Sequence, residues 1–162
     1  MAEIISSLNY FPEEIINLIF DNLDLINLLV LSSTNIWLMN HIRSTKWNNI
    51  YVRIKNINDI NYVMNTFKFI NYDFSYSQIT DSNVKLFAEK QVRKLNLSGC
   101  AAITDSSVKL LGKCHTVFLY DCIRITDSSV KYLGNCHTLN LYSTKITDES
   151  VKYLNAVQNL IR

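Results

Sequence analysis

Apolar and polar positions in the last two thirds of the chain recur in a fixed pattern. A hexamer of the form Ile-Thr-Asp-x-x-Val occurs four times, at steps of 24, 22 and 21 residues: Ile79–Val84, Ile103–Val108, Ile125–Val130 and Ile146–Val151. Short segments lie between the hexamers, each with two apolar positions around an outward one: 72–74, 95–97, 117–119 and 139–141. This alternation is typical of short strands. Each unit is therefore predicted to be a strand, a turn and a short helix.

The predicted helices begin at a threonine followed by an aspartate. These pairs are Thr80-Asp81, Thr104-Asp105, Thr126-Asp127 and Thr147-Asp148. We expect the threonine hydroxyl to accept a bond from a free backbone N–H, and the aspartate to meet the positive end of the helix dipole. An inward face follows at a spacing of three, as in Val108, Leu111 and Cys114. The lysine four residues after each aspartate is expected on the exposed face.

The first fifty residues change to a helical pattern. Pro12 fits the first position of a helix whose apolar stripe includes Ile15 and Ile19. Asp24 and Asn35 can cap two further helices. Three such helices make a small core, so we expect them to dock on the repeats or on a partner. Between them and the repeats, a degenerate first unit is predicted with Asp59, Val63 and Phe69 in its helix.

Composition and charge narrow the functional classes. Of the 162 residues, 48% are hydrophobic and 19% charged, with a net charge of +2, which fits a globular chain. Mixed signs give no basic stripe of the kind that grips phosphate, so nucleic acid is not an expected partner. We expect no transmembrane helix, because acidic residues interrupt the longest apolar stretch. Since no export signal is visible, a cytoplasmic or nuclear location is expected, with the four cysteines as thiols.

The cysteines and histidines are spaced as a ladder. Cys100 and Cys122 are 22 residues apart, as are Cys114 and Cys136, whereas a zinc site needs three or four ligands that converge on one point. The corresponding places in other units hold small or apolar residues: Ser77, Val92, Thr144 and Val157. We therefore predict no metal and no cofactor.

One pair of side chains keeps an enzymatic alternative open. His115 and His137 should stack about one strand spacing, ~4.8 Å, apart, and a metal-dependent enzyme that uses them remains an alternative. The sequence has no Gly-rich phosphate loop, and its acidic pairs lie at predicted helix starts, where the dipole explains them. The prediction is that the chain is not an enzyme.

Two motifs carry a resemblance to known families. The repeat reads Cys114-x-x-Val117-x-Leu119-x-x-Cys122 and then Cys136-x-x-Leu139-x-Leu141-x-x-Thr144, and it resembles the cysteine-containing subclass of leucine-rich repeats. Upstream, the order Phe11-Pro12-Glu13-Glu14-Ile15-Ile16, Ile19-Phe20-x-x-Leu23, Asp24-Leu25, Leu31-Ser32 and Trp47 resembles an F-box. It departs from that pattern at Phe11, Asn35 and Lys46. Together the motifs resemble the short F-box and leucine-rich-repeat proteins of large DNA viruses.

The resemblance implies an α/β fold in three parts. Residues 8–53 would form a three-helix F-box, 54–71 a connecting or degenerate first repeat, and 72–162 leucine-rich repeats with about four strands and the start of another. The repeats would make a short right-handed solenoid with a parallel sheet on its concave face and helices on its convex face. Trp47 would fasten the last F-box helix to the repeats. The open edge at Leu160–Arg162 is expected to invite self-association.

The resemblance also implies a function. The chain would be the substrate-recognition subunit of an SCF-type cullin-RING ubiquitin ligase, in the host cell if it is viral. Residues expected at a Skp-type adaptor are Pro12, Ile15, Ile19, Leu25 and Leu31. A protein substrate would contact outward strand positions, because the concave sheet of a solenoid is its binding surface. These positions are Lys94, Asn96, Ser98, Thr116, Phe118, Tyr120, Thr138, Asn140 and Tyr142.

Other interpretations of these residues stay open. Pro12, Ile15 and Leu25 would also suit plain helix packing, and the outward aromatic side chains could simply cover strand backbone. The alternative function is a leucine-rich-repeat scaffold for protein interaction without a ligase, in which the first helices only cap the repeats.

Overall fold

The chain folds around one open parallel sheet. The structure is a computed structural model that describes residues 12–21, 25–54 and 57–162. Six parallel strands lie side by side in the order of the sequence. They are β1 (Lys46–Arg53), β2 (Lys68–Asp73), β3 (Lys94–Asn96), β4 (Thr116–Phe118), β5 (Thr138–Asn140) and β6 (Asn159–Ile161). The predicted α/β class with a parallel sheet is confirmed.

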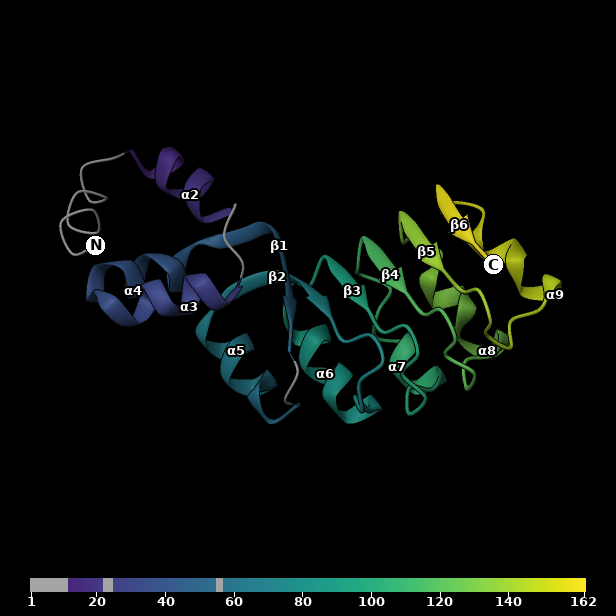
Figure 1. The fold of residues 1–162 in the computed structure, drawn as a ribbon. Coiled ribbons are helices and arrows are strands. Elements are labelled where there is room, and N and C mark those ends of the chain that lie inside the picture. Colours follow the sequence, from purple (N-terminus) through teal and green to yellow (C-terminus); the bar gives the residue numbers. More distant parts are fainter. Residues whose placement is uncertain (1–11, 22–24, 55–56) are drawn as a thin grey trace.

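A helix follows each of the strands β1 to β5 and covers the same side of the sheet (Figure 1). These helices are α5 (Ile60–Thr66), α6 (Asp81–Glu89), α7 (Asp105–Val108), α8 (Asp127–Val130) and α9 (Asp148–Val151). Short 3-10 turns adjoin three of them: η2 (Ile57–Asp59), η3 (Lys131–Leu133) and η4 (Lys152–Leu154). None of the described helices has the length and apolar content that a bilayer span requires.

Three more helices lie beyond the β1 edge of the sheet (Figure 1). They are α2 (Glu13–Asp21), α3 (Leu25–Thr34) and α4 (Ile36–Ser44). The predicted cap of the third helix is confirmed, because the Asn35 side chain accepts bonds from the backbone N–H groups of Trp37 and Leu38. The predicted cap of the second helix, Asp24, lies outside the described residues.

The sheet begins earlier in the chain than predicted. β1 lies inside the segment 8–53 that was assigned to the helical domain, and β2 begins inside the connecting segment 54–71. Phe69, expected in a helix, belongs to β2. Four consecutive β2 residues are buried, so this strand is covered on both faces. A short segment that is buried on both faces has no alternation of exposed and buried positions, so its periodicity does not distinguish it from a buried helix, which explains the difference.

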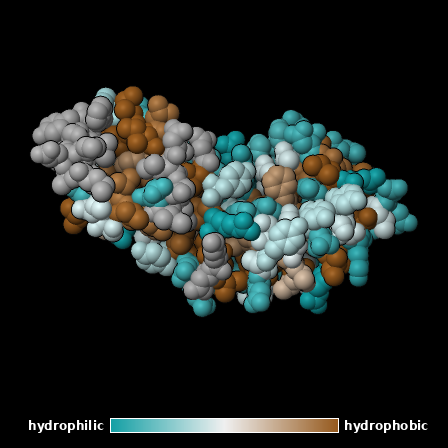
Figure 2. Space-filling model, in the orientation of Figure 1, coloured by the Kyte–Doolittle hydropathy of each residue, from teal (hydrophilic) through white to brown (hydrophobic). Residues whose placement is uncertain are grey.

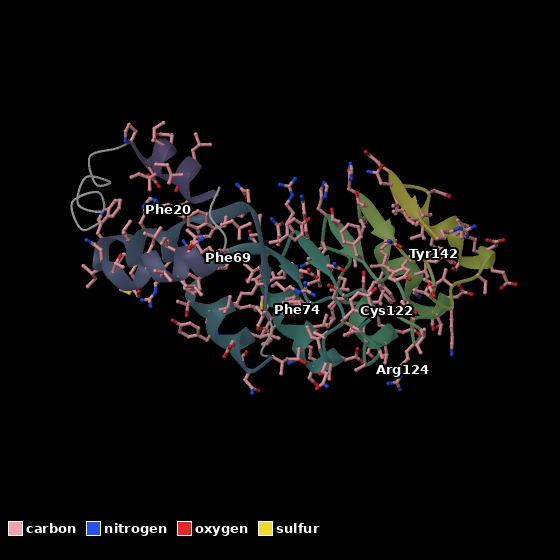
Figure 3. All side chains as sticks on the ribbon, in the orientation of Figure 1. Phe20, Phe69, Phe74, Cys122, Arg124 and Tyr142 are labelled. Carbon is pink, nitrogen blue, oxygen red and sulfur yellow. The ribbon has the colours of Figure 1, made fainter. Side chains whose placement is uncertain are left out.

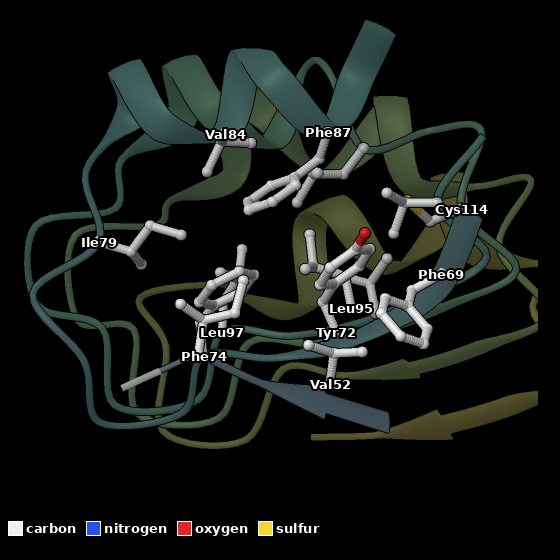
Figure 4. Packing of buried hydrophobic residues seen from close by; sticks show 14 of the residues in the cluster. Val52, Phe69, Tyr72, Phe74, Ile79, Val84, Phe87, Leu95, Leu97 and Cys114 are labelled. Atoms are coloured by element: carbon white, nitrogen blue, oxygen red, sulfur yellow. The ribbon is translucent and has the colours of Figure 1, made fainter. Parts of the chain in front are cut away.

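One hydrophobic core runs from α2 to η4. In its middle, the rings of Tyr72 and Phe74 stack with centroids 6.0 Å apart, and Phe87 from α6 lies 4.9 Å from Phe74 (Figure 4). Further along, the predicted inward residues Val108, Leu111 and Cys114 are buried, as expected.

Trp47 on β1 joins the N-terminal helices to the sheet. Its ring centroid lies 6.0 Å from that of Phe20 on α2 and 6.4 Å from that of Phe69 on β2. The indole Nε1 donates a hydrogen bond of 3.0 Å to the carbonyl of Ile42 in α4. Figure 3 shows Phe20 on the side of α2 that faces α4. The packing role predicted for Trp47 is therefore confirmed.

The aspartate at each helix start bonds to the next unit. The carboxylate of Asp105 accepts hydrogen bonds from the backbone N–H and the hydroxyl of Thr126, at 2.9 and 2.7 Å, and from the hydroxyl of Ser129 at 2.5 Å. Equivalent bonds join Asp81 to Thr104 and Ser107, and Asp127 to Thr147 and Ser150. We call these bonds the aspartate ladder. The helix dipole, which the sequence predicted as the reason for these aspartates, explains them only in part, because α7, α8 and α9 have only four residues each.

The threonine caps are confirmed in two of the four units. The hydroxyls of Thr104 and Thr126 accept bonds from the backbone N–H of Ser106 and Ser128. Thr147 makes no such bond. In the first unit Thr80 and Asn83 form a capping box, in which the Asn83 side chain also accepts from the backbone N–H of Thr80.

All four cysteines are buried free thiols. The thiol of Cys100 donates to the carbonyl of Phe74, and that of Cys122 donates to the carbonyl of Leu97, each at 3.1 Å. Each bond reaches back to the preceding unit, so these cysteines form rungs as the spacing predicted.

Candidate interaction surfaces

Helix α2 carries an exposed apolar face. Ile15 and Ile19, one turn apart, are 42% and 40% exposed, while Ile16 and Phe20 on the adjacent face of the helix are buried. Figure 2 shows hydrophobic side chains gathered over α2. Since a helix of a globular protein usually turns its apolar residues to the core, an additional apolar face indicates a second contact.

The other residues predicted at the adaptor have different surroundings. Pro12 is exposed just before α2, and its carbonyl accepts bonds from the backbone N–H groups of Ile15 and Ile16. Leu31 is partly buried against the hydrophobic core. Leu25 begins α3, but its side chain lies outside the described part of the structure.

Further apolar side chains on the same three helices are exposed, although the sequence pattern did not single them out. They are Leu18, Val30 and Ile36. Helix α3, Leu-Ile-Asn-Leu-Leu-Val-Leu-Ser-Ser-Thr, is apolar around much of its circumference. A helix of that kind at the edge of a small core cannot bury every apolar residue, so the sequence of α3 could have predicted an exposed apolar side chain. Ile15, Leu18 and Ile19 lie on one face of α2, and we call these three residues the helical apolar surface.

The outward positions of the strands form a second surface. Phe118 and Tyr120 are partly exposed, and Tyr142 is 54% exposed. The rings of Tyr120 and Tyr142 stack with centroids 5.8 Å apart and planes 7° from parallel. On the β1 side, the Lys94 ammonium lies 5.5 Å from the centre of the Tyr51 ring.

Two residues predicted to contact a substrate are buried. Thr116 pairs in register with Lys94 and Thr138 on the neighbouring strands, and only 5% of it is exposed. Ser98 precedes Gly99, a residue with positive φ, in a turn whose backbone bonds to that of the neighbouring turn. Covered in this way, neither side chain is open to a partner.

Two more of the predicted contacts are used inside the fold. The side-chain oxygen of Asn96 accepts from the backbone N–H of Ser98 at 3.1 Å, and that of Asn140 accepts from Tyr142 at 3.0 Å. These bonds close the turn after each strand, as Asx turns do. The exposed aromatic residues therefore remain the better candidates for contact with a partner.

The two histidines stack but do not gather further ligands. The ring centroids of His115 and His137 are 4.5 Å apart, close to the predicted spacing. Each Nδ1 lies about 3 Å from the hydroxyl of the next threonine. Burial, together with the positive charges of His137, Arg93 and Lys94, lowers the pKa of His115. Within the described residues, no group of three or more His, Cys, Asp or Glu side chains is placed to hold a metal ion.

Comparison with known proteins does not indicate what these surfaces bind, so their function is inferred from their geometry. No protein-family model matches the chain, and no match was found among the curated proteins.

Proposed function

We propose that the chain is the substrate-recognition subunit of an SCF-type cullin-RING ubiquitin ligase. In this proposal α2, α3 and α4 form an F-box that docks on a Skp-type adaptor, and the strand–helix units are leucine-rich repeats in a right-handed solenoid. The observation that carries it is the helical apolar surface, which lies on the segment where the F-box-like motif occurs.

The energetics support a partner at this surface. Burying an isoleucine side chain fully contributes roughly 1.5–3 kcal/mol. The helical apolar surface leaves much of that contribution unused in the isolated chain. Apolar patches on otherwise polar surfaces are typical of interaction sites. A partner with a complementary apolar groove would bury Ile15 and Ile19 without disturbing the core residues Ile16 and Phe20.

The outward strand surface suits a protein substrate. Phe118, Tyr120 and Tyr142 supply aromatic area, and the two tyrosines add hydroxyl groups; such residues often dominate protein interfaces. The chain would then act by positioning. Holding a substrate lysine near a reactive ubiquitin thioester raises its effective concentration, so the chain needs no catalytic group or cofactor of its own.

Binding to a purified Skp-type adaptor tests the proposal. The double variant Ile15→Asp/Ile19→Asp should lose at least about tenfold in affinity, which corresponds to about 1.4 kcal/mol. Ile123→Asp/Ile161→Asp is the matched control, because these two side chains are 51% and 50% exposed on the loop after β4 and on β6, away from α2, α3 and α4. No binding by the unmodified chain, or equal loss in both variants, would rule the proposal out.

One observation favours the alternative of a scaffold without a ligase. Phe20 and Trp47 belong to the same core as the sheet, so α2, α3 and α4 also close the β1 end of the repeats. If capping is their whole function, the unmodified chain should fail to bind the adaptor, and it should still capture protein partners through Phe118, Tyr120 and Tyr142.

A further inference from the structure

Basic side chains converge where the strands β1 to β4 begin. Two adjoining cavities of about 410 and 350 Å³ share Lys46, Ile70, Lys90 and Gln91 in their walls. The cations that line one or both are Arg43, Lys46, Lys68, Lys90, Arg93 and Lys113. We call this region the basic trough. It is separate from the helical apolar surface and from the outward aromatic residues of β4 and β5.

The trough has a strong excess of positive charge. It holds six of the 16 lysines and arginines of the chain, while Glu89 is the only carboxylate in its walls. Across the described residues, the single ion pair within 4 Å joins Arg162 to Asp148, far along the sequence. No described carboxylate therefore pairs with any of the six cations within 4 Å. Clefts lined by one sign of charge focus the electrostatic field and attract the opposite charge.

Arg43 also has unused hydrogen-bonding capacity. It lies in α4 and lines the smaller cavity, and its Nε is buried without a hydrogen-bond partner in the described structure. A buried donor without an acceptor is unfavourable. An incoming carboxylate is an acceptor that a guanidinium binds well, through two parallel hydrogen bonds.

The remaining walls of the trough distinguish between anionic ligands. Of the aliphatic side chains that line the larger cavity, Leu110 is partly exposed, whereas Ile70, Val92 and Leu111 are buried. The phenylalanine and tyrosine rings that line the two cavities are buried, so they offer no surface on which a nucleic-acid base could stack: Phe67, Phe69, Tyr72 and Phe87. The partly exposed ring of His115 in the larger cavity already stacks on His137. Four of the six cations are lysines, which attract anions as point charges without a fixed planar geometry.

We propose that the basic trough binds an acidic segment of a partner protein. In an extended segment every second side chain points to the same face, so carboxylates at alternate positions would all face the cations of the trough. The proposal does not depend on adaptor binding or on a ligase. It adds a third contact surface, at the edge of the sheet where the strands begin.

Fluorescence anisotropy with labelled peptides tests this proposal on the full chain. The probes are a twelve-residue peptide of alternating Glu and Leu, its Gln and Leu counterpart, and a single-stranded DNA of the same charge. The acidic peptide should bind, its affinity should fall as salt rises, and the Gln peptide should bind at least about tenfold more weakly. No binding of the acidic peptide, equal binding of both peptides, or tighter binding of the DNA would overturn the proposal.

Variants locate the binding. Lys68→Glu/Lys90→Glu should lower the affinity for the acidic peptide at least about tenfold. Lys145→Glu/Lys152→Glu, with the same change in net charge, should change that affinity less than about twofold. Equal losses in the two variants would place binding outside the trough and overturn the proposal. If the first variant fails to fold by circular dichroism, Lys68→Gln/Lys90→Gln removes the same charges without adding new ones, and it must still weaken binding more than Lys145→Gln/Lys152→Gln.

Discussion

The carboxylate of Asp105 bonds to both the backbone N–H and the hydroxyl of Thr126, 21 residues further along the chain. The residue that begins one helix therefore also holds the beginning of the next. Asp81 and Asp127 make the same pair of bonds. On the helix side of the molecule, adjacent units are thus linked by charged hydrogen bonds in addition to the strand pairing of the sheet.

Removing one rung of the aspartate ladder should destabilise the fold. Asp105→Ala leaves the Thr126 and Ser129 groups without their acceptor, and hydrogen bonds to a charged group contribute about 1.5–3 kcal/mol. Because Asp105 is only partly buried, we expect a loss near the lower end of that range. Asp148→Ala is the control, since Asp148 is highly exposed and its one ion pair, with Arg162, is worth about 0–1 kcal/mol. Urea unfolding measures the stability of both variants, and equal losses of stability would show that the aspartate ladder does not stabilise the fold.

The ladder also predicts a loss of stability in acid. Hydrogen bonds from Ser150 and Thr147 lower the pKa of Asp127. For Asp105, burial pushes the pKa upward, but the bonds from Ser129 and Thr126 outweigh it and the pKa is lowered.

A carboxyl group whose pKa is lower in the folded state stabilises the fold above its unfolded pKa, near 3.9, and this contribution disappears as the pH falls through the folded value. Thermal unfolding midpoints should therefore fall steeply below about pH 4. The fall should be shallower in Asp105→Ala. An identical pH profile in the variant would contradict the assignment.

The four thiols should be unreactive while the chain is folded. Burial raises the pKa of Cys114 and of Cys122 to about 12, and that of Cys136 to about 11. Since the thiolate is the nucleophile, iodoacetamide at pH 8 should label the native protein slowly and label all four cysteines in guanidinium chloride. Mass spectrometry measures the labelling. Fast modification of the native chain would show that these side chains are not in a closed core.

Trp47 should couple the helices to the sheet. Trp47→Ala removes the ring between Phe20 and Phe69 together with the bond to the Ile42 carbonyl, and large aromatic deletions in cores cost about 3–5 kcal/mol. Trp37→Ala, at a partly buried ring that stacks on His41, should cost less. Chemical denaturation followed by circular dichroism compares the free energies of unfolding of the two variants. An equal loss in both would mean that Trp47 does not couple the helices to the sheet.

The repeats were predictable because each apolar pattern recurs. Leu95, Val117 and Leu139 pair in register on neighbouring strands, within one residue of the predicted segments. β1 was missed because its alternation is broken. Trp47 and Ile50 are both buried although they are three positions apart, and the pairing with β2 shifts between Trp47 and Tyr51. A bulge of this kind disrupts the two-residue period on which strand prediction depends.

The long-range roles of polar residues were harder to predict. The hydrogen-bond partner of Asp105 lies in another unit, so the sequence of its own helix predicts only an interaction with the helix dipole. The recurrence of Ser107, Ser129 and Ser150 three positions after each threonine was the signal that pointed to a shared acceptor. The basic trough was hidden because its cations come from separate segments and the net charge is only +2.

Hydrogen–deuterium exchange of the chain with and without a purified Skp-type adaptor tests the proposed function most directly. If the helical apolar surface is the docking site, the adaptor should slow exchange in α2 and α3 and leave β4, β5 and β6 unchanged. Protection confined to the sheet, or no protection at any adaptor concentration, would contradict it.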